Sequence, residues 1–380
     1  MSQLFPNAKP RTKAPYRFDI VGSFLRPEGL KQARQQCSCG DISCADLTAV
    51  ENSEINKLVQ HQKSVGLHAV TDGEFRRTFW HLDFLAALGG VDEVDSEKFS
   101  VQFKHHSVRP KTLKITDKIS FPDNHPFLEH YRSLQEIAGD YPVKFTIPSP
   151  SMLHLICTVR ATDYEPIERY RDNRLLLEDI AQAYRSALQK FYALGCRNLQ
   201  LDDTSWGELC SEEKRAAYQA RGFDLQALAR DYVEMINLVI DGKPEDMTVT
   251  MHICRGNFRS TWFSSGGYEP VAETLFGHCR VDGFFLEYDS DRSGDFKPLR
   301  FIKDQQVVLG LVTSKDGQLE DRNEIIQRIK EATQYVDINQ LCLSPQCGFA
   351  STEEGNILTE QQQWDKLSFI RDIAKEVWGE

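Results

Sequence analysis

The stretch MTVTMHIC (247–254) predicts a short strand that ends in polar, chemically reactive side chains, and the rest of the chain repeats this pattern. Seven further short apolar runs lie at 17–24 (RFDIVGSF), 68–74 (HAVTDGE), 143–149 (VKFTIPS), 198–203 (NLQLDD), 283–289 (GFFLEYD), 306–312 (QVVLGLV) and 339–347 (NQLCLSPQC). Helical patterns with apolar residues at three- and four-residue spacing separate most of them, as at 47–67, 175–195, 322–336 and 359–378. Strands that alternate with helices indicate an α/β fold with a parallel sheet, and eight repeats favour a closed (β/α)8 TIM barrel. A doubly wound open sheet is the alternative, but no GxGxxG follows the first predicted strand.

The chain of 380 residues fits one barrel domain over residues 1–380, because barrels with insertions use this length. Residues 92–122 alternate polar and apolar side chains, which predicts a β-hairpin insertion after the second strand–helix unit. Residues 204–222 predict a polar, partly helical loop.

Composition excludes several classes of function. Asp and Glu number 56 against 45 Lys and Arg, and the resulting formal charge of −11 makes nucleic acid an unfavourable partner. No apolar run is long enough to span a membrane, and the basic residues near the N-terminus precede no apolar segment of a secretory signal. We therefore expect a cytoplasmic protein whose ten cysteines are free thiols, metal ligands or packing residues. The sequence does not predict an oligomeric state.

Polar residues occur where the predicted strands end. In a (β/α)8 barrel the active site forms at the carboxyl ends of the strands, so these residues are expected to share one site. The residues are Ser23, Glu74, Asp202, Asp203, His252, Cys254, Glu287 and Cys347.

Four of these residues form a chemically sensible metal site. His252 and Cys254 are two residues apart on a predicted strand, so both side chains point to the same face. Glu287 ends the next strand and Cys347 follows the eighth. One imidazole, two thiolates and a carboxylate suit Zn²⁺. The alternative is a core histidine with two buried packing cysteines.

Six segments resemble those of cobalamin-independent methionine synthases. MHICRGN (251–257), FFLEYD (284–289) and SPQCGF (344–349) are similar to the zinc-binding segments of that family. VGSFLRP (21–27), TDGEF (71–75) and LQLDD (199–203) resemble its homocysteine-contacting segments, in the same order along the chain. The resemblance covers nearly the whole chain and the C-terminal catalytic half of the full-length enzymes, and it is greatest with the short, single-barrel branch.

The resemblance implies a function for each matched residue. His252, Cys254, Glu287 and Cys347 would bind zinc, Ser23 would hold the homocysteine carboxylate, and Glu74 and Asp202 its ammonium group. The reaction would be transfer of a methyl group to the homocysteine thiol, forming methionine, with polyglutamated 5-methyltetrahydrofolate as donor. Asp203 is a further candidate contact, although it should point away from Asp202 on the strand. For Glu74 and Asp202 the alternative is a salt bridge to a structural Arg or Lys.

One segment departs from the family. A donor amine must be protonated to leave, and the family has a histidine shortly after the seventh strand. Here residues 310–321 hold Ser314 and Lys315 but no histidine. A methylated corrinoid protein or a small S-methyl compound are therefore alternative donors, and a non-catalytic barrel that binds zinc and an amino acid is an alternative function.

The remaining histidines and cysteines are expected to have ordinary roles. His81 can reach the pocket, but a surface or capping role is the main expectation. His105 and His106 are adjacent on a predicted strand and so make a poor chelate. Cys37, Cys39 and Cys44 form either a second metal or redox site or simple loop thiols. Packing is expected for Cys157, Cys196, Cys210, Cys279 and Cys342.

Overall fold

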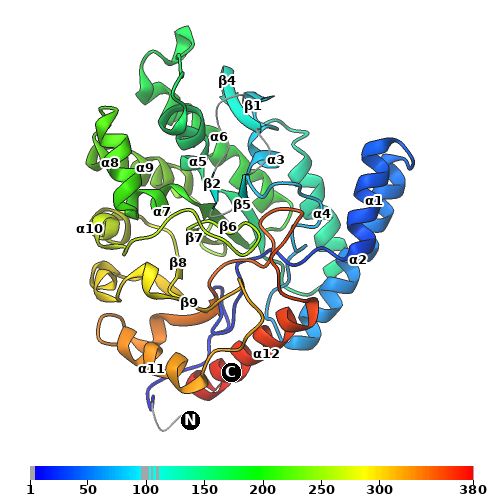
Figure 1. Cartoon of the computed structure of the whole chain (residues 1–380), viewed down its shortest axis with the longest axis vertical. Coiled ribbons are helices and arrows are strands. Elements are labelled where there is room, and N and C mark those ends of the chain that lie inside the picture. Colours follow the sequence, from blue (N-terminus) through cyan, green and yellow to red (C-terminus); the bar gives the residue numbers. More distant parts are fainter. Residues whose placement is uncertain (1–4, 96–101, 104–105, 108–110, 380) are drawn as a thin grey trace.

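The structure is a computed structural model that describes residues 5–95, 102–103, 106–107 and 111–379. Six parallel strands form its central sheet and neighbour each other in chain order. They are β5 (Phe145–Pro148), β6 (Asn198–Asp203), β7 (Thr248–Ile253), β8 (Gly283–Glu287), β9 (Gln306–Val312) and β10 (Leu341–Pro345). Helices surround these strands, as Figure 1 shows, so the predicted α/β class with a parallel sheet is confirmed.

The first two predicted strands join the sheet through isolated bridges. A parallel bridge between Phe18 and Leu343 links residues 17–24 to β10, and one between Ser23 and Gly73 links them to residues 68–74. A third, between Val70 and Val143, reaches the segment just before β5. Eight parallel segments thus follow one another in cyclic order, as in a (β/α)8 barrel. Positive φ angles of 152° at Gly22, 65° at Gly73 and 61° at Glu74 interrupt regular pairing in both segments.

Side chains from opposite parts of this ring meet inside it. Gln200 on β6 donates from Nε2 to the Val21 carbonyl at 2.8 Å. Lys144 pairs with Asp19 at 3.1 Å and lies 3.8 Å from the centre of the Phe285 ring. A small apolar cluster fills the interior beside them and consists of Val21, Phe285, Val308 and Cys342. The carboxyl ends of the strands therefore rest on a packed interior.

The helices begin and end at residues typical of caps. Ser43 and Thr359 each form a capping box, and Gly66 ends a helix in the left-handed conformation. The α-helices are α1 (Glu28–Cys39), α2 (Cys44–Val65), α3 (Leu82–Leu85), α4 (Pro126–Ala138), α5 (Pro150–His154), α6 (Asn173–Ala193), α7 (Ser205–Cys210), α8 (Glu212–Ala220), α9 (Leu225–Ile240), α10 (Glu269–His278), α11 (Arg322–Ala332) and α12 (Glu360–Trp378). Shorter turns are the π-helical η1 (Leu155–Arg160) and the 3-10 segments η2 (Glu168–Tyr170), η3 (Asp291–Ser293), η4 (Lys297–Phe301) and η5 (Ile338–Gln340). None of the helices among the described residues is long and apolar enough to cross a membrane.

Residues 204–222 were expected to be a polar, partly helical loop, and they form two helices. All six residues of α7 are buried, because this helix lies over the carboxyl ends of the strands rather than on the surface. Gly207 of α7 sits so close to the chain at Cys254 that a Cβ there would be 2.3 Å from the Cys254 carbonyl oxygen. The segment therefore divides into a buried α7 and a largely exposed α8.

The predicted hairpin insertion is present. β1 (Gly89–Asp95) and β4 (Lys111–Ser120) pair antiparallel, and the short strands β2 (Gln102–Phe103) and β3 (His106–Ser107) pair between them. Buried Leu113 fixes β4 to η1 because its carbonyl accepts from the Cys157 thiol at 3.5 Å. His105 lies outside the described residues, and the side chain of His106 does too.

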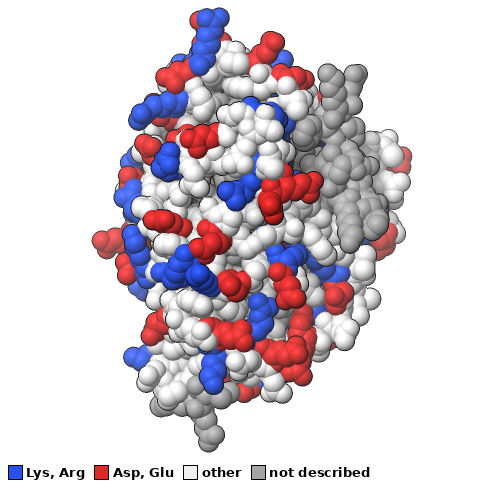
Figure 2. Space-filling view, turned by 60° about the vertical axis from the view of Figure 1, so that its left-hand side comes forward, with Lys and Arg blue, Asp and Glu red and all other residues white. Residues whose placement is uncertain are grey.

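The surface charges and the state of the cysteines can be compared with the expectations from the sequence. On the face shown in Figure 2, basic and acidic side chains are interspersed rather than gathered by sign. All ten cysteines lie in the described part of the chain and are free. The five expected to be packing residues are buried, which confirms that interpretation: Cys157, Cys196, Cys210, Cys279 and Cys342.

Candidate metal centre and substrate pocket

Four predicted metal ligands converge at the carboxyl ends of β7, β8 and β10. His252, Cys254, Glu287 and Cys347 are all buried, and one ligand atom from each lies within 4.8 Å of all the others. His252 and Cys254 share a face because strand side chains alternate with period two. Glu287 is the last residue of β8, and Cys347 follows β10 by two residues.

The geometry of this cluster fits a tetrahedral zinc ion. The Sγ atoms of Cys254 and Cys347 are 3.7 Å apart. Two thiolates at the usual distance of about 2.3 Å from a tetrahedral zinc would lie about 3.8 Å apart. Both ring nitrogens of His252 are buried, and neither meets the geometry of a hydrogen bond to a described residue. The donor set therefore offers a metal two sulfurs, an imidazole nitrogen and a carboxylate oxygen.

The hydrogen bonds and charges of the cluster shift the pKa values of its own thiols and imidazole. The Cys254 thiol donates to Cys347 and, with help from His252, holds the pKa of Cys347 well below its usual range against the effect of burial. The same hydrogen bond, together with burial, raises the pKa of Cys254. Burial lowers the pKa of His252, but Cys347 and Asp202 outweigh it and raise that pKa to about 9. The cluster thus already favours one thiolate, the form that binds metals.

Asp202 lies beside the metal cluster. It is the register partner of His252 across β6 and β7, and Gln200 donates to its Oδ1 at 2.7 Å. Burial is the main reason that its pKa rises to about 7, and the charge of Glu74 adds to the rise. Among the described residues, no Lys or Arg forms an ion pair with it. Its main opposing charge is His252, which would be neutral as a metal ligand, so with a metal bound this carboxylate suits a ligand that brings its own cation.

Two roles were considered for Glu74: a contact with the substrate ammonium group and a salt bridge to a structural Arg or Lys. Its Oε1 pairs with Arg77 at 3.3 Å and accepts from the Thr146 hydroxyl at 3.0 Å, so the salt bridge to a structural arginine exists. Its Oε2 is buried and has no hydrogen-bond partner among the described residues. Burial raises the pKa of Glu74, although Arg77 and Arg26 oppose that rise. Sequence spacing gave no sign that Arg77 and Thr146 would belong to the site.

Ser23 is held against the loop that carries Cys347. Its Oγ accepts from the Ala350 backbone N–H at 3.3 Å. Gly348 makes this approach possible, because a Cβ there would lie 1.9 Å from Ser23 Oγ. The hydroxyl is therefore placed next to the metal ligands by the absence of a side chain at Gly348.

Asp203 points away from Asp202, as the strand period predicts. Its Oδ1 accepts from the backbone N–H groups of Ser205 at 2.6 Å and Trp206 at 3.3 Å, and Ser151 donates to its other oxygen. These bonds hold the first turn of α7. A contact between Asp203 and substrate remains a prediction from the resemblance.

A cavity of about 480 Å³ opens beside Cys254. Its walls include Trp80 and His81, Leu113 of the hairpin insertion, and Arg160 of η1. His81 is the half-buried N-cap residue of α3, but its side chain makes no cap hydrogen bond; its Nδ1 is buried, and the residue lines this cavity. Burial, with the nearby charge of Arg160, lowers the pKa of His81 to about 3, so the ring is neutral at pH 7. One drug-sized molecule fits a cavity of this volume.

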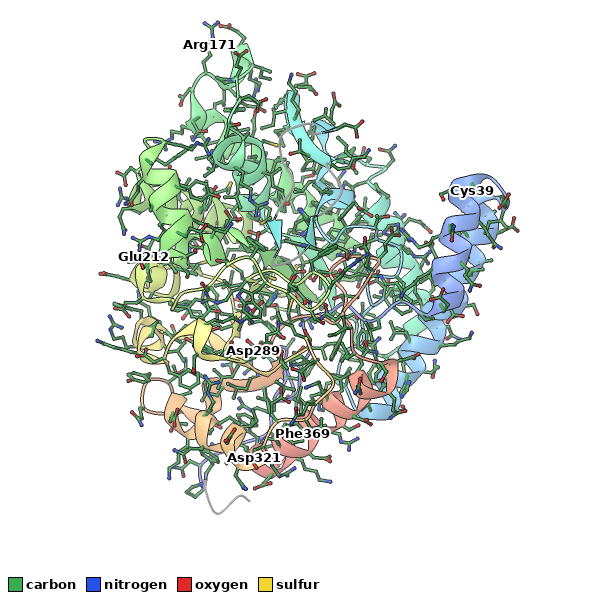
Figure 3. The ribbon with its side chains drawn as sticks, in the orientation of Figure 1. Cys39, Arg171, Glu212, Asp289, Asp321 and Phe369 are labelled. Carbon is green, nitrogen blue, oxygen red and sulfur yellow. The ribbon has the colours of Figure 1, made fainter. Side chains whose placement is uncertain are left out.

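The segment that departs from the family lies next to this site. Ser314 Oγ donates to the Gly348 carbonyl at 2.9 Å, which braces the loop that follows Cys347. Lys315 is buried, and its Nζ has no hydrogen-bond partner among the described residues. Cys37, Cys39 and Cys44 lie elsewhere, where α1 meets α2, and Cys39 is labelled at that tip in Figure 3.

Comparison with known proteins shows the family of this chain. Residues 19–376 match the model of the cobalamin-independent synthase catalytic domain. The chain belongs to that family. The Bacillus subtilis protein YxjH, which carries no assigned function, is 49% identical over 368 residues and is matched over 96% of each chain.

Two solved structures of this family are similar to the chain. One is a Listeria monocytogenes protein with the provisional name vitamin-B12-independent methionine synthase. It is 44% identical, has a TM-score of 0.77, and is matched over 97% of this chain and 99% of its own. The other, a B12-independent methionine synthase from Shewanella sp. W3-18-1 in complex with selenomethionine, shares the fold at 18% identity and a TM-score of 0.68. That match covers 94% of this chain and 96% of the Shewanella chain.

Proposed function

We propose that this cobalamin-independent synthase homologue is a zinc-dependent methyltransferase that methylates the thiol of homocysteine to form methionine. The observation that carries the proposal is the buried set of His252, Cys254, Glu287 and Cys347, with ligand atoms within 4.8 Å of one another, beside the buried carboxylate of Asp202, which forms no ion pair with a Lys or Arg among the described residues. A metal site alone would suit many reactions. A metal site with an adjacent anion suits a substrate that carries both a thiol and an ammonium group.

Zinc held by these four residues would lower the pKa of a bound thiol and so supply a nucleophilic thiolate at neutral pH. Side chains of the pocket bind the remaining polar groups of the substrate. Asp202 and the open oxygen of Glu74 pair with the substrate ammonium, and Ser23 donates its hydroxyl to the substrate carboxylate. Burial of all three side chains excludes water, which strengthens each contact and keeps the thiolate reactive.

For the methyl donor we propose 5-methyltetrahydrofolate, with a polyglutamate tail. The cavity beside Cys254 has the volume for one small molecule with flat rings, and Trp80 lines it. Arg160, which pairs with buried Glu208, also lines it. These features favour a compact donor over a corrinoid carried on another protein, whose macrocycle would have to approach through the same cavity.

Methionine formation tests the proposal. Zinc-loaded protein is given homocysteine and 5-methyltetrahydrofolate as the mono- and triglutamate, with metal-free protein and Cys347→Ala protein as controls. We expect methionine only from the zinc-loaded wild type. If homocysteine binds the metal but no methionine forms, the folate assignment is wrong and methyl-corrinoid and small S-methyl donors are assayed next. If homocysteine does not bind, the methyltransferase proposal is wrong.

A further inference from the structure

The backbone of Glu287 is fixed by the sheet and by a tyrosine hydroxyl. It ends β8 and pairs in register with Gly310 of β9. The Tyr268 hydroxyl accepts from the Glu287 N–H at 3.0 Å and lies 3.2 Å from the Glu287 carbonyl, where it donates. Movement of Glu287 is therefore confined to its side chain.

The carboxylate of Glu287 has a second set of partners beside the metal cluster. Its Oε1 accepts from the backbone N–H of Arg255 at 3.0 Å. Its Oε2 pairs with Nη2 of Arg292 at 2.9 Å, and the two side chains are 0% and 7% exposed. Both oxygens are thus satisfied by the chain alone, while an oxygen of the same group lies within 4.8 Å of the other three ligand atoms.

Arg292 is itself held in place on η3. The same Nη2 pairs with Asp289 at 2.7 Å, and the guanidinium carbon lies 5.0 Å from the centre of the Trp262 ring. Asp289, labelled in Figure 3, follows β8 by two residues, so the arginine is anchored close to the strand that carries Glu287. An arginine fixed in this way holds a carboxylate in one geometry.

A thiolate that takes the place of Glu287 on the metal leaves the charge of the metal site unchanged. It would also leave the displaced carboxylate buried, where an unpaired charge is very unfavourable. We propose that Arg292 is a positioning residue that holds the Glu287 carboxylate when it is off the metal and thereby makes its replacement by the substrate thiol favourable. This proposal rests on the proposed function, since it requires a thiol substrate at the metal.

Zinc K-edge X-ray absorption tests this role without an activity assay. Wild type, Arg292→Gln and Arg292→Lys are loaded with zinc and measured with and without homocysteine, and homocysteine affinity is measured by calorimetry. Arg300→Gln is the matched control, because Arg300 pairs with Glu269 on the exposed surface. Arg292→Lys keeps a charge and carries the test if Arg292→Gln weakens the fold.

We expect every variant to bind zinc with the same ligands when homocysteine is absent. With homocysteine, wild type and Arg300→Gln should exchange one oxygen ligand for sulfur. Arg292→Gln should keep its oxygen ligand at concentrations that saturate wild type, with affinity reduced roughly tenfold to hundredfold, the range for a hydrogen bond to a charged group. Arg292→Lys should lie between them.

Two results would overturn the role of Arg292. One is the same ligand exchange and affinity in Arg292→Gln as in wild type. The other is loss of zinc from both Arg292 variants before homocysteine is added, which would make Arg292 a support for the metal-bound carboxylate. If the wild type itself gains no sulfur ligand, the thiol-binding function fails, and the role of Arg292 fails with it.

Discussion

Substitution of Asp202 by Asn should stabilise the metal-free protein and weaken its hold on homocysteine. Asp202 is 5% exposed, and its pKa of about 7 stands well above the ordinary value of 3.8. Between these two pH values the folded state keeps a proton that the unfolded state has released. Stability therefore falls as pH rises from about 4 to 7, and the whole penalty remains above pH 7.

The expected gain in the free energy of unfolding follows from the difference between the folded and ordinary pKa values of Asp202. A difference of about three pKa units corresponds to on the order of 4 kcal/mol. Asn keeps the oxygen that accepts from Gln200 but brings an amide group that must also be solvated or bonded. We therefore expect the free energy of unfolding of Asp202→Asn to exceed that of wild type by about 1–3 kcal/mol at pH 8 and to fall below it by about 1–3 kcal/mol near pH 4, where only the cost of the amide remains. Urea unfolding of metal-free protein measures both values.

The same substitution should weaken homocysteine binding to zinc-loaded protein by about 1–3 kcal/mol, because the substrate ammonium loses its charged partner. Calorimetry with homocysteine and with 4-mercaptobutanoate, which lacks the amino group, separates this contact from the thiol contact. Affinity for 4-mercaptobutanoate should not change. Lower stability at pH 8 together with unchanged homocysteine affinity would refute the reasoning, since Asp202 would then be a paired structural anion.

Asp203→Asn is the matched control on the neighbouring residue. Its carboxylate accepts from two backbone N–H groups at the start of α7 and from Ser151, so the amide should lower stability by about 1–2 kcal/mol at pH 8. Homocysteine affinity should stay at the wild-type value. A loss of affinity in Asp203→Asn would instead support the substrate contact predicted from the family resemblance.

Three further outcomes are expected. Replacing Cys254 or Cys347 by Ala should abolish zinc binding, measured by atomic absorption after dialysis, and full metal occupancy in either variant would contradict the ligand set. Between pH 8 and pH 6 homocysteine affinity of the wild type should fall about tenfold more than affinity for 4-mercaptobutanoate, because both thiols lose a proton on binding but protonation of Asp202 near pH 7 removes only the partner of the ammonium; equal pH dependence for the two thiols would exclude Asp202 from the pocket. Gly348→Ala should raise the dissociation constant of homocysteine at least tenfold and lower the melting temperature, since its Cβ would meet Ser23 Oγ at 1.9 Å; unchanged affinity would remove Ser23 from the site.

The metal cluster was predictable because it depends on regular structure. The period of two on β7 places His252 and Cys254 on one face, and parallel strands bring Glu287 and Cys347 to the same end of the sheet. Local periodicity also located β5 to β10 and the longer helices. These elements bury apolar faces at fixed spacing, and the sequence displays that spacing directly.

The contacts and pairings that the sequence did not predict depend on irregular backbone conformation. Arg77 reaches Glu74 because the chain turns at Gly73 and Glu74, both with positive φ, and no residue spacing encodes that turn. The same turn explains why residues 68–74 join the sheet by single bridges rather than as a paired strand. Burial of α7 likewise follows from where it lies over the strand ends, close to the backbone at Cys254.

The buried charges around the cluster divide into those already paired and those left for a ligand. Arg77 pairs with Glu74 and Arg292 with Glu287, whereas Asp202 forms no ion pair with a Lys or Arg among the described residues, and its main opposing charge is His252, which would be neutral as a metal ligand. A substrate with an ammonium group and a thiol would bring a cation to Asp202, while its thiolate would take the place of a carboxylate that Arg292 holds. A simple thiol would supply only the second of these contacts and would leave Asp202 without that cation. The pairing of charges therefore discriminates between an amino-acid thiol and a plain alkyl thiol, and it does so through Asp202 rather than through the metal.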